Sequence, residues 1–399
     1  MTKKTASTGL LKLTILSISL MISAASAISV TLPMIKTQFP DVSAATVESL
    51  VTIPSFTMMI FILLSSFIIK RIGEKKTVIL GLSLAFIGGV IPAFVANFEI
   101  IFISRFILGA GTGIYNSLAI SLIGDYFEGE TQQKMLGYQT AFSTLGSSFV
   151  TFLAGILVNL SWQYSYLIYF FTLPIVLMVI FFLPEKKKTS SDNGTSQSEV
   201  KSKQSVNSLV IFSCIMMFLF FILVMNIYTK TSTLISDENY ANQGFLGTTM
   251  TIGSLVGALG GFVYSYVRKL FKNLTPVIAL AAIALAYFLI PYAGNMLMLT
   301  IIMAIGFVVV STFIPYMYDI LLPGAPENSS NLAVSLAMVA CNLGSFFSPY
   351  VIQGLGSLTG NTSAAFSFII GGFVFAIMAL IFLVRTSLKP KTVAVSSEK

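Results

Sequence analysis

Arg105 is the residue whose type and position most directly suggest chemistry, because it is a single cation inside a long apolar stretch. Gly109, Thr112 and Asn116 follow it at helical spacing, so the four residues share one helix face. If this helix enters a membrane near Ile100, Arg105 lies about 8 Å deep. A cation there is costly unless it is paired or hydrated, so we expect Arg105 to face a cavity and to serve a substrate or proton pathway. The alternative is that it reaches the surface or packs between helices.

Other polar side chains also occur within apolar stretches and are weaker candidates for a substrate or proton pathway. Two sets of three residues repeat at i, i+4 and i+7, namely Ser19, Ser23 and Ser26, and Thr312, Tyr316 and Asp319. Two amides, Gln139 and Asn342, lie outside these sets. Small hydroxyl residues in membrane helices often serve close packing. We therefore expect fewer than half of these residues to touch a substrate.

Several kinds of chemistry are excluded by residue type. The chain has no histidine, which removes imidazole-based catalysis and histidine metal sites. Its two cysteines lie in apolar runs, so neither a disulfide framework nor a metal site is expected. The glycine run at 109–113 follows no strand, and no phosphate-binding loop of the ATPase type occurs, so no nucleotide cofactor is predicted. We expect neither an enzyme nor a cofactor.

The elements that must position these residues are membrane helices. The sequence is 55% hydrophobic and only 10% charged, whereas a soluble domain carries about 25% charged residues. No soluble surface exists on which cations and aromatics could bind nucleic acid, despite a formal charge of +8. In units of about 20 apolar residues, the predicted spans are 10–32, 47–69, 77–97, 100–124, 137–159, 165–183, 208–229, 244–267, 274–293, 296–322, 331–355 and 363–384.

The spans divide into two groups of six. The segment 184–206 is rich in Ser and Lys and has no apolar period, which is typical of a solvated linker. We therefore predict an all-α membrane protein with bundles at 1–183 and 207–399. The first span, with its lysines and small residues near 23–27, also resembles a cleavable signal peptide. Counting it as a span makes the two halves match.

The cations predict the orientation. If the amino end is inside, 20 of the 23 Lys and Arg residues fall in inner segments, and only Lys36 and Lys230 lie outside. Because positive residues resist translocation, both termini and the linker are predicted to be cytoplasmic. The expected location is the cell membrane.

The two halves resemble each other in sequence. The run at 144–157 aligns with the run at 342–355, and Gly109 aligns with Gly306 at nearly the same offset. Duplicated halves of this kind build many secondary transporters.

At the level of family, the chain resembles the major facilitator superfamily along essentially its whole length. Arg71, Gly73, Lys75 and Lys76 match the family's signature loop between helices two and three, in which Lys70 replaces an acid. The run "RFILGAGTG" at 105–113 matches the pattern of helix four, and Asp125 follows at that helix's inner end. The run at 161–186, with its leading Trp and closing Pro-Glu, is similar to helix six.

The resemblance implies a fold of two pseudo-symmetric six-helix bundles with a central cavity lined by helices one, four, seven and ten. Asn226 of helix seven thereby joins the pathway residues. The resemblance also implies a cytoplasmic gate in which the loop latches the outward-open state, with Lys70, Arg71, Gly73 and Asp125 as its residues. The alternative for these cations is that they only fix the topology.

Together these observations predict a secondary transporter of a small organic molecule, working by alternating access. Walls rich in Phe, Met and Ser favour an amphipathic, drug-like substrate, and export coupled to proton influx is the first choice. No acid lies at the centre of a span, so Asp125, Asp319 and Glu48 are the acids left for a proton. Uptake or facilitated diffusion, a lipid flippase and a non-transporting sensor are the alternatives. The expected partners are the substrate, protons and membrane lipids, with a monomeric chain.

Overall fold

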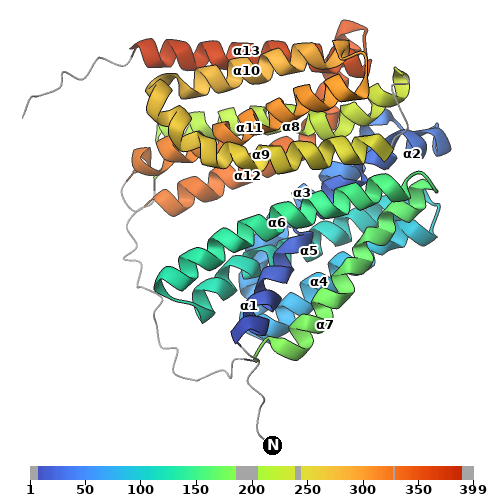
Figure 1. The fold of residues 1–399 in the computed structure, drawn as a ribbon, viewed down its shortest axis with the longest axis vertical. Helices are drawn as coiled ribbons and strands as arrows, with labels where there is room; N and C mark the ends of the chain where they lie inside the picture. The colour runs from blue at the N-terminus through green and yellow to red at the C-terminus, as the bar shows by residue number, and fades with distance from the viewer. Residues whose placement is uncertain (1–7, 186–204, 239–243, 327–328, 389–399) are drawn as a thin grey trace, which may run out of the picture.

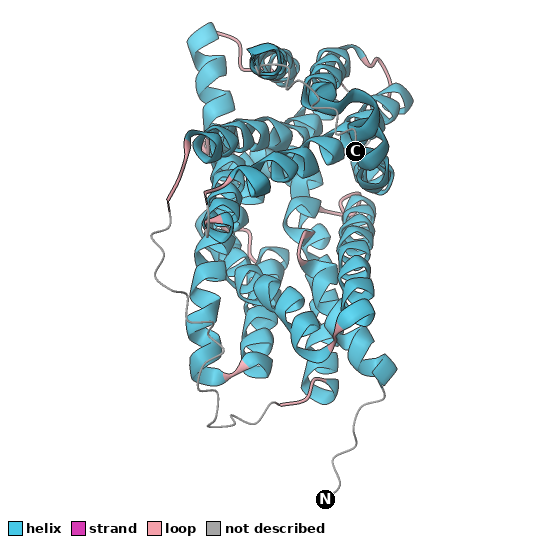
Figure 2. Ribbon diagram, turned by 90° about the vertical axis from the view of Figure 1, so that its left-hand side faces the viewer, coloured by secondary structure: helices cyan, strands magenta, loops and turns pink. Residues whose placement is uncertain are grey.

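A computed structural model describes residues 8–185, 205–238, 244–326 and 329–388. Within these ranges every regular element is helical, and short loops join the helices (Figure 2). Eleven of the described helical segments are long and apolar enough to cross a membrane, and a further helix is apolar over Gly244–Gly260. The predicted class, an all-α membrane protein, is confirmed. The predicted boundary at 184–206 falls largely outside the described residues, so the exact domain limits stay a prediction.

The helices follow the predicted order along the chain. The first half contains α1 (Thr8–Ser17), η1 (Ile18–Met21), η2 (Ala24–Thr31), α2 (Leu32–Gln38), α3 (Ala44–Ile72), α4 (Glu74–Phe94), α5 (Phe98–Tyr126), α6 (Gly129–Leu157), η3 (Trp162–Phe171) and α7 (Thr172–Phe182). The second half contains α8 (Ser208–Asp237), α9 (Gly244–Phe271), η4 (Lys272–Leu274), α10 (Thr275–Leu289), η5 (Ile290–Tyr292), α11 (Met296–Gly324), α12 (Ser330–Thr359) and α13 (Ala364–Leu388).

Local sequence explains where several helices begin. Ser43, Asn97, Asn207 and Asn295 each accept a hydrogen bond from a backbone N–H in the first turn of the helix that follows. Such side chains satisfy an amide that the helix itself leaves unpaired. Gly73 ends α3 and precedes α4 with a φ of 83°, a conformation that a side chain would disfavour. Gly73 therefore makes a sharp turn between α3 and α4.

The helices form two bundles, one from residues 8–182 and one from 208–388 (Figure 1). We call the end of the molecule that carries Lys70, Arg268 and Arg385 the cationic end, and the end that carries the loops near Asp41 and Asn361 the opposite end. In Figure 1 the bundles approach each other toward the opposite end and diverge toward the cationic end. The separation between the inner faces of the two bundles therefore increases toward the cationic end (Figure 1).

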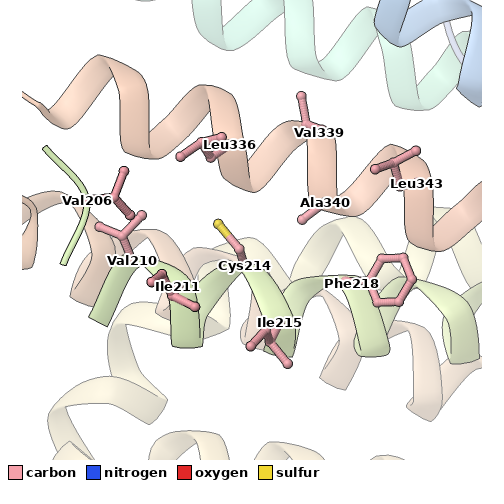
Figure 3. A pocket seen from close by; sticks show the side chains of 10 residues that line it. All are labelled: Val206, Val210, Ile211, Cys214, Ile215, Phe218, Leu336, Val339, Ala340 and Leu343. Carbon is pink, nitrogen blue, oxygen red and sulfur yellow. The ribbon is translucent and has the colours of Figure 1, made fainter. Parts of the chain in front are cut away.

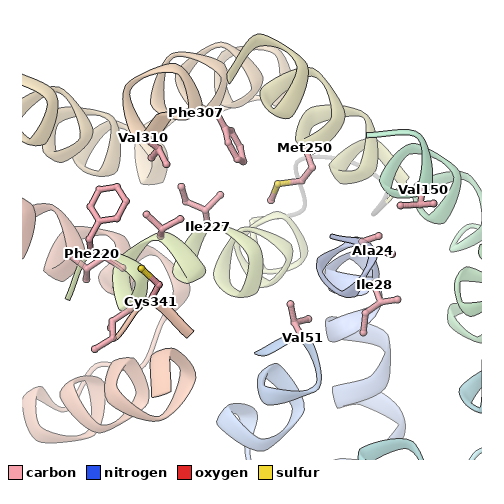
Figure 4. Close-up of a cluster of buried hydrophobic side chains, with 14 of the residues drawn as sticks. Ala24, Ile28, Val51, Val150, Phe220, Ile227, Met250, Phe307, Val310 and Cys341 are labelled. Carbon is pink, nitrogen blue, oxygen red and sulfur yellow. The ribbon is translucent and has the colours of Figure 1, made fainter. Parts of the chain in front are cut away.

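Contacts between α6 and α9, between α3 and α12, and between α8 and the first two spans join the bundles toward the opposite end. Gly155 of α6 packs so closely on α9 that an added Cβ would lie 2.8 Å from the Gly244 oxygen. The Thr251 hydroxyl of α9 donates to the carbonyl of Ser148 over 3.0 Å. The α3–α12 seam and an ion pair, described below, complete the contact. Buried apolar residues of both bundles form one cluster, with Met250 of α9 and Ala24 of η2 on the two sides of the interface (Figure 4).

The first and sixth spans differ from the uninterrupted helices that the sequence predicts. Residues 18–31 and 162–171 are largely 3-10 helix, and α-helix resumes only at Leu32 and Thr172. A 3-10 segment has poorer hydrogen-bond geometry than an α-helix. In hydrocarbon its carbonyls need partners from the protein itself. In the first span, Arg105, Tyr115 and Tyr169 supply such partners.

We predict that Gly155→Leu will loosen the opposite end, because overpacking at a close crossing costs about 1–3 kcal/mol. The measurement is oxidative cross-linking of cysteines placed at Ser148 and Thr251, in a chain whose native cysteines are replaced by alanine. The cross-linked fraction should fall in Gly155→Leu. It should be unchanged in Gly137→Leu, since nothing lies within 4 Å of a Cβ there. Equal cross-linking in all three proteins would contradict the packing role.

Candidate functional site

The described part of the chain buries three charged side chains. Arg105 is 0% exposed, Glu48 is 4% exposed and Lys230 is 5% exposed. Burial of a charge inside a membrane protein is costly unless the charge is paired or bonded, so such residues mark functional or architectural sites. The structure divides them into two sites. Arg105 lies within the N-terminal bundle, and Glu48 and Lys230 meet between the bundles.

The guanidinium of Arg105 is bonded entirely by its own bundle. Its Nε donates to the carbonyl of Leu50 on α3 over 2.9 Å, and Nη2 donates to the carbonyl of Ala25 in η2 over 3.2 Å. Nη1 donates to the Tyr169 hydroxyl of η3 over 3.3 Å. Arg105 therefore ties α5 to three other elements and is fully enclosed in this conformation. Its role in a substrate or proton pathway stays a prediction.

Aromatic side chains complete the surroundings of Arg105. The Tyr169 hydroxyl donates to the carbonyl of Ala24 over 3.2 Å, and the Tyr115 hydroxyl donates to the carbonyl of Met21 over 3.1 Å. The guanidinium carbon also lies 5.8 Å from the ring centres of both Tyr166 and Tyr169. These donors supply the partners that the 3-10 segment of the first span requires. No local sequence pattern pairs these tyrosines with that segment.

The other predicted pathway residues fall into a buried and a partly exposed set. The buried set is Thr112, Asn226, Thr312 and Tyr316. Thr112 and Thr312 donate to carbonyls of their own helices, and the Asn226 amide donates to Ser367 of α13. The partly exposed set is Asn116, Gln139 and Asn342. Only the second set offers side-chain surface in this conformation, and the pathway role of all these residues stays a prediction.

A buried ion pair connects the two bundles. The Lys230 ammonium of α8 lies 2.5 Å from Oε1 of Glu48 on α3, although the two residues are 182 positions apart. The other carboxylate oxygen, Oε2, is buried and has no hydrogen-bond partner. The sequence pattern predicts a loop at Lys230, because the predicted span stops at residue 229. In the structure α8 continues to Asp237 and carries Lys230 into the interface.

The α3–α12 seam surrounds this ion pair. Ala45, Glu48, Thr52 and Phe56 repeat along α3 at helical spacing, so they share a face. On that face the backbone N–H of Ala45 donates to Gln353 over 2.7 Å. The Thr52 hydroxyl donates to the carbonyl of Phe346 over 3.3 Å. The rings of Phe56 and Phe346 lie 4.8 Å apart. The seam thus seals the space between the bundles at the opposite end.

At the cationic end, the predicted gate residues lie at the surface. Lys70, Arg71 and Asp125 are exposed, and Gly73 forms the turn between α3 and α4. The neighbouring Lys75 ammonium donates to the carbonyl of Ile180 on α7 over 2.7 Å. The resemblance assigned the latch to the outward-open state, whereas here the bundles diverge at this end. The gate role of Lys70, Arg71, Gly73 and Asp125 therefore stays a prediction.

The second bundle carries a cationic cluster in the corresponding place. Nε of Arg268 bonds to Oδ2 of Asp319 over 3.0 Å, and Nη1 donates to the carbonyl of Lys272 over 2.5 Å. The Arg385 guanidinium lies 4.1 Å from the ring centre of Phe212. A cavity of about 290 Å³ opens between Arg268 and Arg385. Asp319, which the sequence analysis assigned to a pathway stripe, thus pairs with Arg268.

An apolar groove lies between α8 and α12 toward the cationic end (Figure 3). Its volume is about 340 Å³, and its α12 wall consists of Leu336, Val339, Ala340 and Leu343. At helical spacing Val339 and Leu343 share a face with Phe346, which contacts α3. Val339 and Leu343 therefore lie on the α12 face that turns toward the N-terminal bundle, beyond the end of the seam. Cys214, a free thiol, also lines it.

No group of three metal-binding side chains occurs within the described ranges. The site is therefore made of buried charge pairs and hydrogen bonds to backbone, with apolar and amide surface beyond them. Nothing in this arrangement requires covalent chemistry. It can hold two bundles together at one end and leave them apart at the other.

Comparisons with known proteins agree with this architecture. The family model described as Major Facilitator Superfamily matches residues 14–349. No curated protein matches the chain. A crystal structure of a D-xylose-proton symporter is 16% identical, with a TM-score of 0.71, and the match covers 94% of this chain and 97% of that one.

Two further solved structures have the same fold. An inward-open xylose transporter, XylE from E. coli, is 15% identical with a TM-score of 0.72, covering 94% of this chain and 95% of that chain. A mutant of the nucleoside transporter NupG is 15% identical with a TM-score of 0.75, covering 94% and 99%. At these identities the likeness establishes the fold, and the substrates of those proteins remain their own.

We predict that Tyr169→Phe will destabilise the N-terminal bundle, because it removes the donor to Ala24 and an acceptor for Arg105. Leaving buried groups without partners costs about 1–3 kcal/mol. Equilibrium unfolding with a denaturing detergent measures the free energy of unfolding. Tyr164→Phe is the matched control, since that side chain is 49% exposed. Equal stability of the two variants would show that the hydrogen bonds of Tyr169 are dispensable.

Proposed function

We propose that this chain, which belongs to the major facilitator superfamily, exports a small amphipathic organic compound across the cell membrane by alternating access, in exchange for protons. Membership of the family makes the chain a membrane transporter rather than an enzyme. The substrate class, the direction and the coupling to protons are the proposed parts.

The observation that carries the proposal is that the contacts joining the bundles gather at one end. The Gly155 crossing, the α3–α12 seam and the Glu48–Lys230 pair close the opposite end. Toward the cationic end the bundles diverge (Figure 1). A path closed at one end and open at the other is the arrangement that alternating access requires, with the bundles rocking about a central site.

The charge distribution supports assigning the cationic end to the cytoplasm. Lys70, Arg71, Arg268, Lys269 and Arg385 all lie there. The two cations of the opposite end are held by protein groups. The Lys36 ammonium donates to the carbonyls of Pro40 and Val42, and Lys230 pairs with Glu48. Because positive residues favour the cytoplasmic side, the conformation described here is assigned as inward-facing.

The surface near the divergence supports an amphipathic substrate. On α3, Leu63 and Phe67 continue the seam face toward the cationic end and are 61% and 66% exposed. The apolar groove of α8 and α12 lies on the other bundle. The partly exposed amides Gln139 and Asn342 could fix a polar group of the substrate. Binding sites for such compounds are mostly apolar with a few placed polar groups.

The absence of a nucleotide-binding loop from the sequence supports drive by an ion gradient rather than by ATP. Export requires loading from the cytoplasmic side, and the inward-facing surface described above is apolar. A lipophilic compound that has entered the cytoplasmic leaflet could reach that surface. The proposed direction is therefore outward, with protons moving inward.

The test is transport by the purified protein in liposomes with and without a pH gradient. We predict gradient-driven transport of ethidium, a lipophilic cation, and no transport of xylose, uridine or a fluorescent phospholipid. Asn342→Leu should reduce ethidium transport severalfold, whereas Asn361→Leu, in a loop of the opposite end, should not. Transport of the sugar or nucleoside alone would overturn the substrate class. Phospholipid movement between leaflets would instead identify a flippase.

A further inference from the structure

We propose that Glu48 is the proton-binding group of this transporter and that Lys230 competes with the proton for it. The inference rests on the proposed function for its role in coupling, but its structural part stands without a substrate. Glu48 is the buried acid of the described residues, and it lies at the interface that must open and close. No other buried acid of the described part occupies such a position.

The geometry allows Glu48 either to pair with Lys230 or to carry a proton, but not both. With Glu48 ionised, the Lys230 ammonium is bound 2.5 Å from Oε1. A proton on the carboxylate removes that attraction and takes away the counter-charge bonded to the buried ammonium, which is strongly unfavourable. Separation of the bundles then lowers the free energy, because it exposes the Lys230 ammonium to water. Oε2, which has no partner, is the oxygen available to the proton.

The other groups near the pair do not replace either partner. On α12, Gln353 accepts from the Ala45 amide and the Phe346 ring packs on Phe56, and neither of these side chains is titratable. On α8, Asp237 acts on Lys230 through its charge. Lys36 of α2 is bonded to loop carbonyls. Lys230 is therefore the charge that opposes a proton on Glu48.

This competition gives the proton a direction. When the opposite end is open, Glu48 is hydrated and takes a proton from the outer medium. When that end closes, the Lys230 ammonium returns to the carboxylate and displaces the proton. The displaced proton passes to water, and the proposal places that water on the side toward the cationic end, where the bundles diverge. One proton binds the carboxylate outside and one is released inside in each cycle, whichever way the substrate moves.

The test follows opening of the seam without any substrate. Thr52 is fully buried in the seam, so a cysteine there reacts with a bulky charged maleimide only when the opposite end opens. The chain lacks its native cysteines and is held in lipid nanodiscs. Each rate is divided by that of a cysteine at exposed Asp41, which corrects for ionisation of the thiol.

We expect the corrected rate to rise about tenfold between about pH 8 and about pH 5.5 as protons displace Lys230. Glu48→Gln should react fast at both pH values. Glu130→Gln is the matched control, because its pair with Lys134 is 2.6 Å long but exposed, and it should behave as the parent does. If Glu48→Gln is poorly folded, the exchanged pair Glu48→Lys with Lys230→Glu should restore slow labelling at about pH 8.

The coupling role is tested on the same variants in liposomes. Glu48→Gln should retain ethidium exchange but lose accumulation driven by a pH gradient. A labelling rate that does not change with pH, or a Glu48→Gln protein that still labels slowly at about pH 8, would overturn the proton site. If labelling responds to pH but no compound is carried, the proposed function fails while the proton site stands.

Discussion

The hydrocarbon interior of the bilayer offers no water to a buried polar group, and the charged core of this transporter is organised by that constraint. Arg105, Glu48 and Lys230 are each enclosed, and each is bonded to protein. The two solutions differ in kind. Arg105 is satisfied by neutral backbone carbonyls and tyrosine hydroxyls, whereas Glu48 and Lys230 satisfy each other.

This difference assigns separate tasks to the two sites. The bonds of Arg105 stay within one bundle, so they can persist while the bundles move as bodies. They also allow the first span to be 3-10 helix where Ala24 and Ala25 present their carbonyls. The Glu48–Lys230 pair joins the bundles and must break when the opposite end opens. Rigidity is thus built into the bundle, and reversibility into the interface.

The sequence predicts the membrane class and the order of the spans, because long apolar runs and cationic loops are local properties. It identifies Arg105, but its partners depend on a departure from α-helix near residue 24 that no local pattern signals. Glu48 and Lys230 are both visible as charges near span ends, yet they are 182 positions apart. Their pairing depends on how the bundles face each other, which requires the tertiary structure. A predicted span that ended at Asp237, as α8 does, and not at residue 229 would have placed Lys230 inside a helix.

The most direct test of the account is a pair of distances between the bundles, measured between spin labels by electron paramagnetic resonance. One label pair replaces Asp41 and Asn361 at the opposite end, and the other replaces Lys134 and Lys272 at the cationic end. Acidification should lengthen the first distance and shorten the second in the same protein. A first distance that stays fixed, or two distances that change in the same sense, would contradict alternating access governed by the buried pair.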